Sequence, residues 1–78
     1  MKVKVTVTLK EGVLDPEGKA IQKTLSHLGF DETKEVRQGK VISLEVEDGT
    51  SEKRIKEMCD KLLANPVIED YDIEMQAG

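Results

Sequence analysis

Residues 12–19 read Gly-Val-Leu-Asp-Pro-Glu-Gly-Lys and superficially resemble a phosphate-binding loop. A P-loop has one residue fewer between its glycines, and its Lys is followed by a Ser or Thr that binds magnesium. Here Ala20 stands where that hydroxyl is needed, and the carboxylates of Asp15 and Glu17 would repel phosphate. The segment therefore predicts a loop followed by a capped helix rather than a nucleotide site.

His27 and Cys59 are the chain's single histidine and single cysteine. Zinc takes three or four protein ligands, mostly Cys and His, so these two residues cannot complete a zinc site. Cys59 falls on a predicted apolar helix face, where cysteines act as small hydrophobic side chains, and His27 falls in the last turn of a predicted helix. The carboxylates occur in solvated runs such as Asp31-Glu32 rather than in a predicted pocket. We predict no catalytic, metal-binding or cofactor-binding residue.

The composition favours a chain that works with partners. It has 78 residues, of which 37% are apolar and 3% aromatic, and a net charge of −4. A core of this size rarely supplies more than about 3–5 kcal/mol without a disulfide, a metal or another subunit. The negative charge and the absence of aromatic residues from the predicted strand at 40–47 disfavour nucleic-acid binding. No apolar run approaches the ~18 residues that span a bilayer, so we expect a cytoplasmic protein without membrane contact.

Strands are predicted where apolar and polar residues alternate. Lys2–Lys10 alternates strictly, with its valines on one side. Residues 33–37 form a weaker strand that a hairpin turn at Gln38-Gly39 joins to the strand 40–47, with Gly39 supplying the positive φ that such turns need. The last strand ends near Met75.

Two helices are predicted between these strands. The first begins at Asp15-Pro16, a cap followed by a proline suited to the first helical position, and ends at Gly29. Thr50 or Ser51 caps the second helix, which Asn65-Pro66 stops. The apolar stripe of the second helix is Ile55, Met58, Cys59, Leu62 and Leu63.

The predicted fold is α+β, a single domain over residues 1–78 with the order β-α-β-β-α-β. A two-layer sandwich of ferredoxin-like order, an antiparallel sheet with both helices on one face, would bury every apolar stripe. The outer sheet face, with Thr6, Thr8, Val41 and Ser43, is either solvent-exposed or a subunit contact.

Four stretches resemble the PurS family of small subunits of phosphoribosylformylglycinamidine (FGAM) synthase. They occur in family order across nearly the whole chain: residues 9–21, Leu28-Gly29-Phe30, Val36-Arg37-Gln38-Gly39-Lys40 and residues 63–69. The Gly-Val-Leu-Asp-Pro-x-Gly run and the Val-Arg-x-Gly-Lys run are the most specific. Gln38 stands where the family is expected to have a small apolar residue such as valine.

The resemblance implies a non-catalytic subunit in de novo purine (IMP) biosynthesis. It would form a homodimer or higher homo-oligomer and bridge a glutaminase subunit and an ATP-dependent synthetase subunit for ammonia transfer. ATP and Mg would be used by the large synthetase subunit, with no cofactor bound by this chain.

Several residues match the family motifs and are candidates for partner contact: Asp15, Pro16, Arg37 and Lys40. Asp15 and Pro16 have an alternative role in capping the helix. Gly18, Gly29 and Gly39 are interpreted as turn, cap or close-packing positions. Arg37 and Lys40 show no local role in the sequence, so they either meet an acidic partner surface or are simply solvated.

Two other functions remain open from the residues alone. An ACT-type module that senses small molecules shares the element order and often has Gly-Val-Leu after its first strand, as residues 12–14 do. A small ferredoxin-like enzyme is the third possibility, but it would need a nucleophile or an acid–base pair that the sequence does not show.

Overall fold

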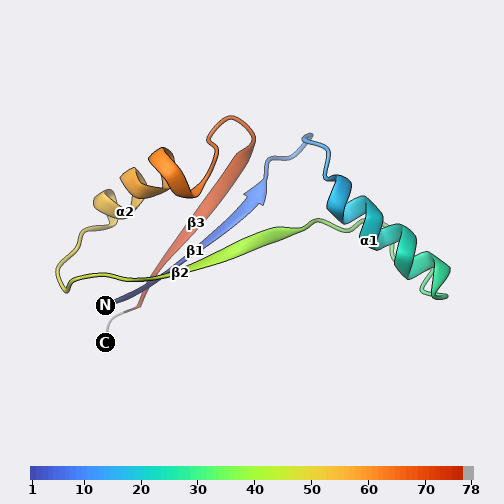
Figure 1. Cartoon of the computed structure of the whole chain (residues 1–78), viewed down its shortest axis with the longest axis horizontal. Helices are drawn as coiled ribbons and strands as arrows, with labels where there is room; N and C mark the ends of the chain where they lie inside the picture. Colours follow the sequence, from blue (N-terminus) through green and yellow to red (C-terminus); the bar gives the residue numbers. More distant parts are fainter. Residues whose placement is uncertain (77–78) are drawn as a thin grey trace.

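The computed structural model describes residues 1–76, which contain a three-stranded antiparallel sheet and two helical segments (Figure 1). The strands are β1 (Lys2–Leu9), β2 (Gly39–Glu45) and β3 (Glu69–Gln76), in the sheet order β2-β1-β3. The helices are α1 (Pro16–His27) and α2 (Glu52–Met58), and α2 continues as a π-helical turn, η1 (Cys59–Leu63). The α+β class is confirmed, whereas the full ferredoxin-like order is not formed within these residues.

The core lies where α2 and η1 cover β1 and β3. Val3, Val5 and Val7 of β1 point to this face and are buried, as are Ile55 and Cys59. Ile42 and Leu44 of β2 pair with Val5 and Val3 but remain only partly buried. The half of the sheet face that carries β2 is therefore covered less well than the half under α2.

The strand predicted over 33–37 is wrong for this chain. Within residues 1–76 this segment pairs with no strand, and β2, the strand that the predicted hairpin would have joined to it, pairs with β1 alone. The segment instead returns beside α1, where the Gln22 side chain donates to the Lys34 carbonyl oxygen at 2.6 Å. The carbonyl oxygens of Thr33 and Lys34 are thus bonded to a side chain of the helix that precedes them.

The predicted hairpin turn at Gln38-Gly39 is wrong as well. Gly39 is the first residue of β2, it pairs with Thr8, and its φ is not positive. A Cβ placed on Gly39 would lie 2.6 Å from the Val7 carbonyl oxygen. Glycine is needed there because two strands approach closely, not because the chain reverses.

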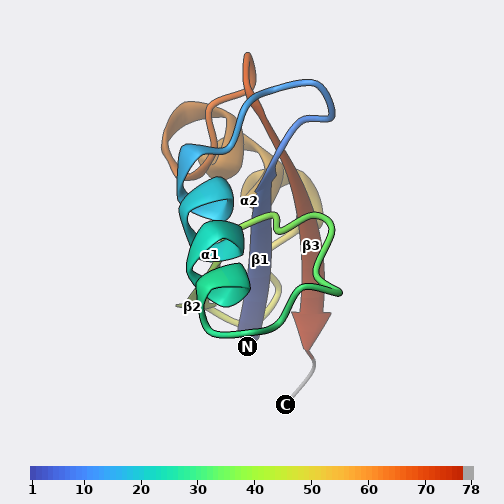
Figure 2. The same ribbon diagram turned by 90° about the vertical axis from the view of Figure 1, so that its right-hand side faces the viewer.

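The predicted packing of α1 against the sheet is also wrong. Within the described residues α1 lies beyond the ends of the strands, on the side away from α2, as Figures 1 and 2 show. The Cα radius of gyration is 15.9 Å, against about 11–12 Å for a compact chain of this length. We call residues 16–35, which comprise α1 and the loop after it, the arm.

The π turn changes which residues of the second helix reach the core. The Ala64 N–H donates to the Cys59 carbonyl oxygen at 2.9 Å, a bond across five residues rather than four. This wider turn moves the buried position along the chain, so that Ala64 is buried while Leu62 is 83% exposed. The prediction that Leu62 belongs to the buried stripe is therefore wrong.

Candidate functional site

Two connections join the arm to the sheet, and polar contacts link them to each other. Residues 10–15 lead out to α1, and residues 36–38 lead back to β2. We call these two connections, together with Leu9 and Gly39, the joint.

Asp15 is the central residue of the joint. It is the N-cap of α1, and its Oδ1 accepts a hydrogen bond of 2.8 Å from the Gly18 N–H. Its Oδ2 accepts one of 2.7 Å from the N–H of Gln38 on the returning connection. The residue is 7% exposed. One carboxylate thus caps the helix and bonds the outgoing connection to the returning one.

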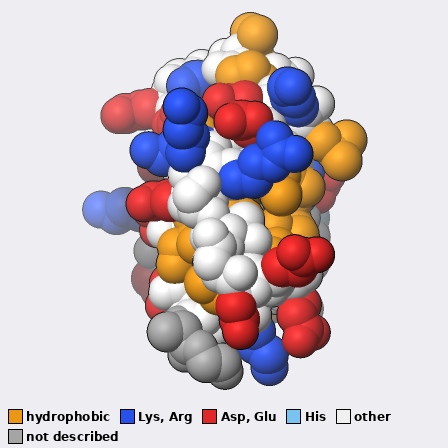
Figure 3. Space-filling model, turned by 90° about the vertical axis from the view of Figure 1, so that its left-hand side faces the viewer, with side chains coloured by type: hydrophobic (Ala, Val, Ile, Leu, Met, Phe, Trp, Pro, Cys, Tyr) orange, Lys and Arg blue, Asp and Glu red, His pale blue; other side chains and the backbone are white. Residues whose placement is uncertain are grey.

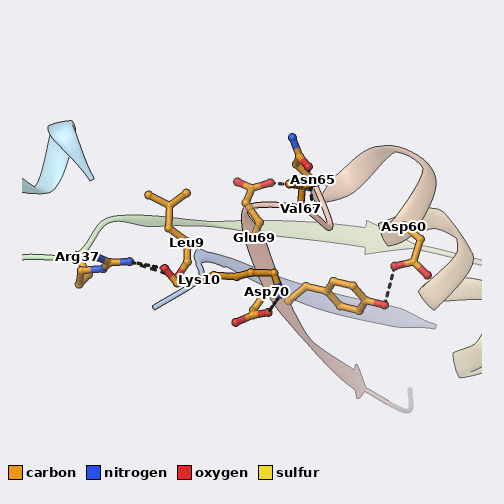
Figure 4. A network of polar contacts seen from close by, with 9 residues as sticks. Leu9, Lys10, Arg37, Asp60, Asn65, Val67, Glu69 and Asp70 are labelled. Atoms are coloured by element: carbon orange, nitrogen blue, oxygen red, sulfur yellow. Dashed lines mark hydrogen bonds and ion pairs between the residues drawn. The ribbon is translucent and has the colours of Figure 1, made fainter. Parts of the chain in front are cut away.

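Gly18 and Arg37 complete these contacts. A Cβ on Gly18 would clash with the Val36 carbonyl oxygen, so the first turn of α1 and the returning connection touch through their backbones. The Arg37 guanidinium donates to the carbonyl oxygens of Lys10 and Val13, each at 3.1 Å. Its contact with the Leu9 carbonyl oxygen is drawn in Figure 4. Arg37 therefore has a local role that the sequence did not reveal.

Hydrogen bonds to the Asp15 carboxylate lower its pKa. The N–H of Gln38 has the largest effect and that of Gly18 the next, because both stabilise the charged form. Since the pKa is lower in the folded than in the unfolded state, protonation favours unfolding. The stability that Asp15 contributes is full above its ordinary pKa near 3.8 and is lost as the pH falls through the lower folded value.

We therefore expect Asp15→Asn to destabilise the protein most near neutral pH. The difference in free energy of unfolding between wild type and variant should shrink as the pH falls below about 4. Urea titrations at a series of pH values measure this difference. A difference that stays constant from neutral to acid pH would contradict the assignment.

The other candidate contact residues lie around the joint. Pro16 is the first residue of α1 and is exposed. Lys40 follows Gly39 in β2, opposite Val7, and borders a cleft of about 230 Å³ together with Asp15, Glu17 and Glu69. Contact of these residues with another protein stays a prediction.

The arm carries apolar side chains that the described residues leave uncovered. Ile21, Leu28 and Phe30 are 40%, 68% and 50% exposed. Gly29, at φ +99°, ends the helix and turns the chain so that the Phe30 N–H bonds to the Leu25 carbonyl oxygen at 2.9 Å. The apolar stripe of α1 is therefore a surface rather than part of the core.

An open groove of about 430 Å³ lies beside β2, between that strand and the second helix. Its apolar residues are Leu44, Met58, Leu62 and Leu63, and its charged rim is Arg54, Glu57 and Lys61. Figure 3 shows the end of the molecule opposite the arm, where apolar areas lie between acidic and basic side chains. The groove and the arm are thus two uncovered apolar surfaces of one chain.

The surroundings of Cys59 and Tyr71 do not favour chemical reactivity. Burial raises the pKa of the Cys59 thiol, which opposes formation of a nucleophilic thiolate. A hydrogen bond to Asp60 is the main cause of the raised pKa of Tyr71. Within residues 1–76, no group of three or more His, Cys, Asp and Glu side chains is arranged to hold a metal ion. None of the helices in this part of the chain is long and apolar enough to cross a membrane.

Comparison with known proteins identifies one family. The sequence model of PurS, described as phosphoribosylformylglycinamidine (FGAM) synthase, matches residues 2–77. The chain is similar to the phosphoribosylformylglycinamidine synthase subunit PurS of Bacillus subtilis, with 51% identity over 77 residues that cover 96% of this chain and 92% of the relative. It is also similar to the PurS subunit of Methanocaldococcus jannaschii, with 49% identity over 78 residues that cover 96% and 94%.

Solved structures give the same result. The structure of Bacillus subtilis PurS superimposes with a TM-score of 0.91 at 50% identity, covering 97% of this chain and 98% of that one. A chain in the structure of PurLQS from Thermotoga maritima superimposes with a TM-score of 0.80 at 37% identity, covering 94% and 93%. The superposition on solved relatives thus extends over nearly the whole chain.

Proposed function

The chain belongs to the PurS family of phosphoribosylformylglycinamidine (FGAM) synthase subunits, and we propose that it is the non-catalytic assembly subunit of that ligase. FGAM synthase is a glutamine-dependent enzyme of purine biosynthesis, and this chain is its PurS subunit. The family that matches is not the ACT family, so the alternative of an amino-acid-sensing module is set aside.

In this proposal the chain bridges the glutaminase and the large synthetase subunit so that ammonia passes between them. The observation that supports an assembly role is the pair of uncovered apolar surfaces, the arm and the groove, on a chain with a small core. The structure of PurLQS from Thermotoga maritima contains a relative of this chain. By extension, PurL and PurQ are the partner subunits here, ATP and Mg are bound by the large subunit, and the complex works in the cytoplasm.

We also propose that the chain forms a homodimer. In a ferredoxin-like order the first helix covers the part of the sheet that α2 leaves open. Here the chain's own α1 projects away from that part, so the α1 of a second copy can cover it. The stripe of Ile21, Leu25 and Leu28 offers apolar area to the groove beside β2, and two equivalent contacts close a two-fold dimer.

Reconstitution tests the assembly role. The synthetase and glutaminase subunits are mixed with and without this chain, and FGAM formation is measured with glutamine and, separately, with ammonium chloride. We expect glutamine-dependent formation to require the chain, because ammonia must pass between active sites, and ammonia-dependent formation to require it much less. An equal rate from glutamine with and without the chain would refute the proposal.

A further inference from the structure

The direction of the arm must be set at its base. Within the described residues α1 makes no extensive contact with the sheet or with α2, and Figure 1 shows it held clear of both. A helix joined by two flexible connections would sample many directions. The contacts of the joint are therefore the structural features that can select one direction.

Arg37 bonds the returning connection to the end of β1. Its Nη2 donates to the carbonyl oxygens of Lys10 at 3.1 Å and Leu9 at 3.4 Å, while its Nη1 donates to that of Val13 at 3.1 Å. Figure 4 shows the guanidinium reaching the chain where β1 ends. The planar group, with its donors in a rigid fork, fixes the distance and the orientation of these two segments.

Lys10 extends this anchoring to the other edge of the sheet. Its Nζ lies 2.7 Å from Asp70 Oδ1 of β3, and its backbone N–H donates to the Ile68 carbonyl oxygen at 2.8 Å. The segment that Arg37 holds is thus itself bonded to the strand beside it. The base of the joint is continuous with the sheet.

Asp15 bonds the helix itself to this base. Its two carboxylate oxygens hold the first turn of α1 through Gly18 and the returning connection through Gln38. The Gln38 side chain adds a bond of 2.6 Å to the Glu17 carboxylate. Gly18 lets the helix backbone lie directly against Val36. The first turn of α1 is therefore held to both connections.

We propose that Asp15 and Arg37 are positioning residues that fix the direction of α1 away from its own sheet. The arm is then unable to cover its own groove and is presented to another molecule. The fixed direction follows from the joint alone, while its use in a dimer rests on the proposed function.

Distances between two spin labels on one chain measure this direction. Cysteines replace Lys23 on the exposed side of α1 and Ser43 on the outer face of β2, and the labelled chain is diluted with excess unlabelled chain. Dilution makes the measured distance intramolecular, and every chain also carries Ile21→Glu and Leu28→Glu, so that contacts with a second copy do not hold the arm in place. The wild-type chain, whose Cys59 is buried, shows whether label attaches there.

Asp15→Ser separates the two roles of the carboxylate. Serine accepts a hydrogen bond from the first helical turn about as well as aspartate does, but its single short hydroxyl cannot also reach the N–H of Gln38. Arg37→Met removes the contacts with the three carbonyl oxygens. Lys34→Met is the matched control, because it removes a cation three residues before Arg37, at the end of the arm, and leaves the joint contacts in place.

We expect one narrow distance distribution for the wild-type chain and for Lys34→Met. Asp15→Ser and Arg37→Met should give broader distributions with added shorter distances, while far-UV circular dichroism shows unchanged helix content. A wild-type distribution as broad as those of the variants, or variants as narrow as wild type, would overturn the inference. If the distance distributions are as expected but the chain has no effect on FGAM formation, only the proposed function is refuted.

Discussion

Replacing Ile21 and Leu28 with glutamate is expected to convert the proposed dimer into a folded monomer of 8.7 kDa. Both side chains are exposed on the arm, at 40% and 68%, so the substitutions should change the stability of the single chain little. The two copies of a dimer bury four such side chains, and the free energy of association falls by at least about 1.5 kcal/mol for each of them. That loss weakens association by about four orders of magnitude.

Light scattering coupled to size-exclusion chromatography measures the mass, and glutamine-dependent FGAM formation measures the functional result. Lys23→Glu is the matched control, because it changes the net charge by the same −2 on the opposite side of the helix. The control should remain dimeric. A double variant that keeps the dimer mass at micromolar concentration would show that α1 does not form the interface.

Ile55→Ala is expected to remove most of the stability of the fold. Ile55 lies on the inner face of α2, its side chain is 0% exposed, and it belongs to the same core cluster as the valines of β1. Truncating a buried isoleucine costs roughly 2–5 kcal/mol, close to the whole stability that a core of this size supplies, about 3–5 kcal/mol. Urea unfolding followed by circular dichroism should show the midpoint falling close to zero denaturant.

Leu62→Ala is the matched control for the core, since it is a similar truncation in the same helical segment. Because the π turn leaves Leu62 83% exposed, its loss should change the stability of the single chain by roughly 0.5 kcal/mol or less. The comparison is made in the monomeric Ile21→Glu, Leu28→Glu background, so that groove contacts with a second copy do not contribute. Equal costs at positions 55 and 62 would contradict the register described for the second helix.

Local patterns in the sequence predicted most of the elements. Asp15-Pro16 and Gly29 mark the ends of α1 because capping and positive φ depend on residues adjacent in the chain. Ser51 caps α2 for the same reason, with its side chain accepting from the Arg54 N–H. Strict alternation identified β1 because one of its faces is fully buried.

The features that sequence reasoning missed depend on contacts between distant residues. The direction of α1 is set by Arg37 and by the second oxygen of Asp15, and neither bond has a signal in the spacing of residues. Gly39 looked like a turn residue because its close approach to Val7 can be seen only in the folded sheet. The wide turn that exposes Leu62 is likewise one bond between Ala64 and Cys59, without a characteristic motif.

The central position of β1 has a consequence for the order of events during biosynthesis. β1 pairs with β3 in a register that joins Lys2 to Gln76, so the first strand to be synthesised is flanked by the last. Such non-local pairing cannot form until residues 69–76 have left the ribosome. The valines of β1 therefore stay without their full cover until residues 69–76 have emerged and paired with them. A chain stalled shortly before residue 69 should be sensitive to protease, whereas the released chain should resist it.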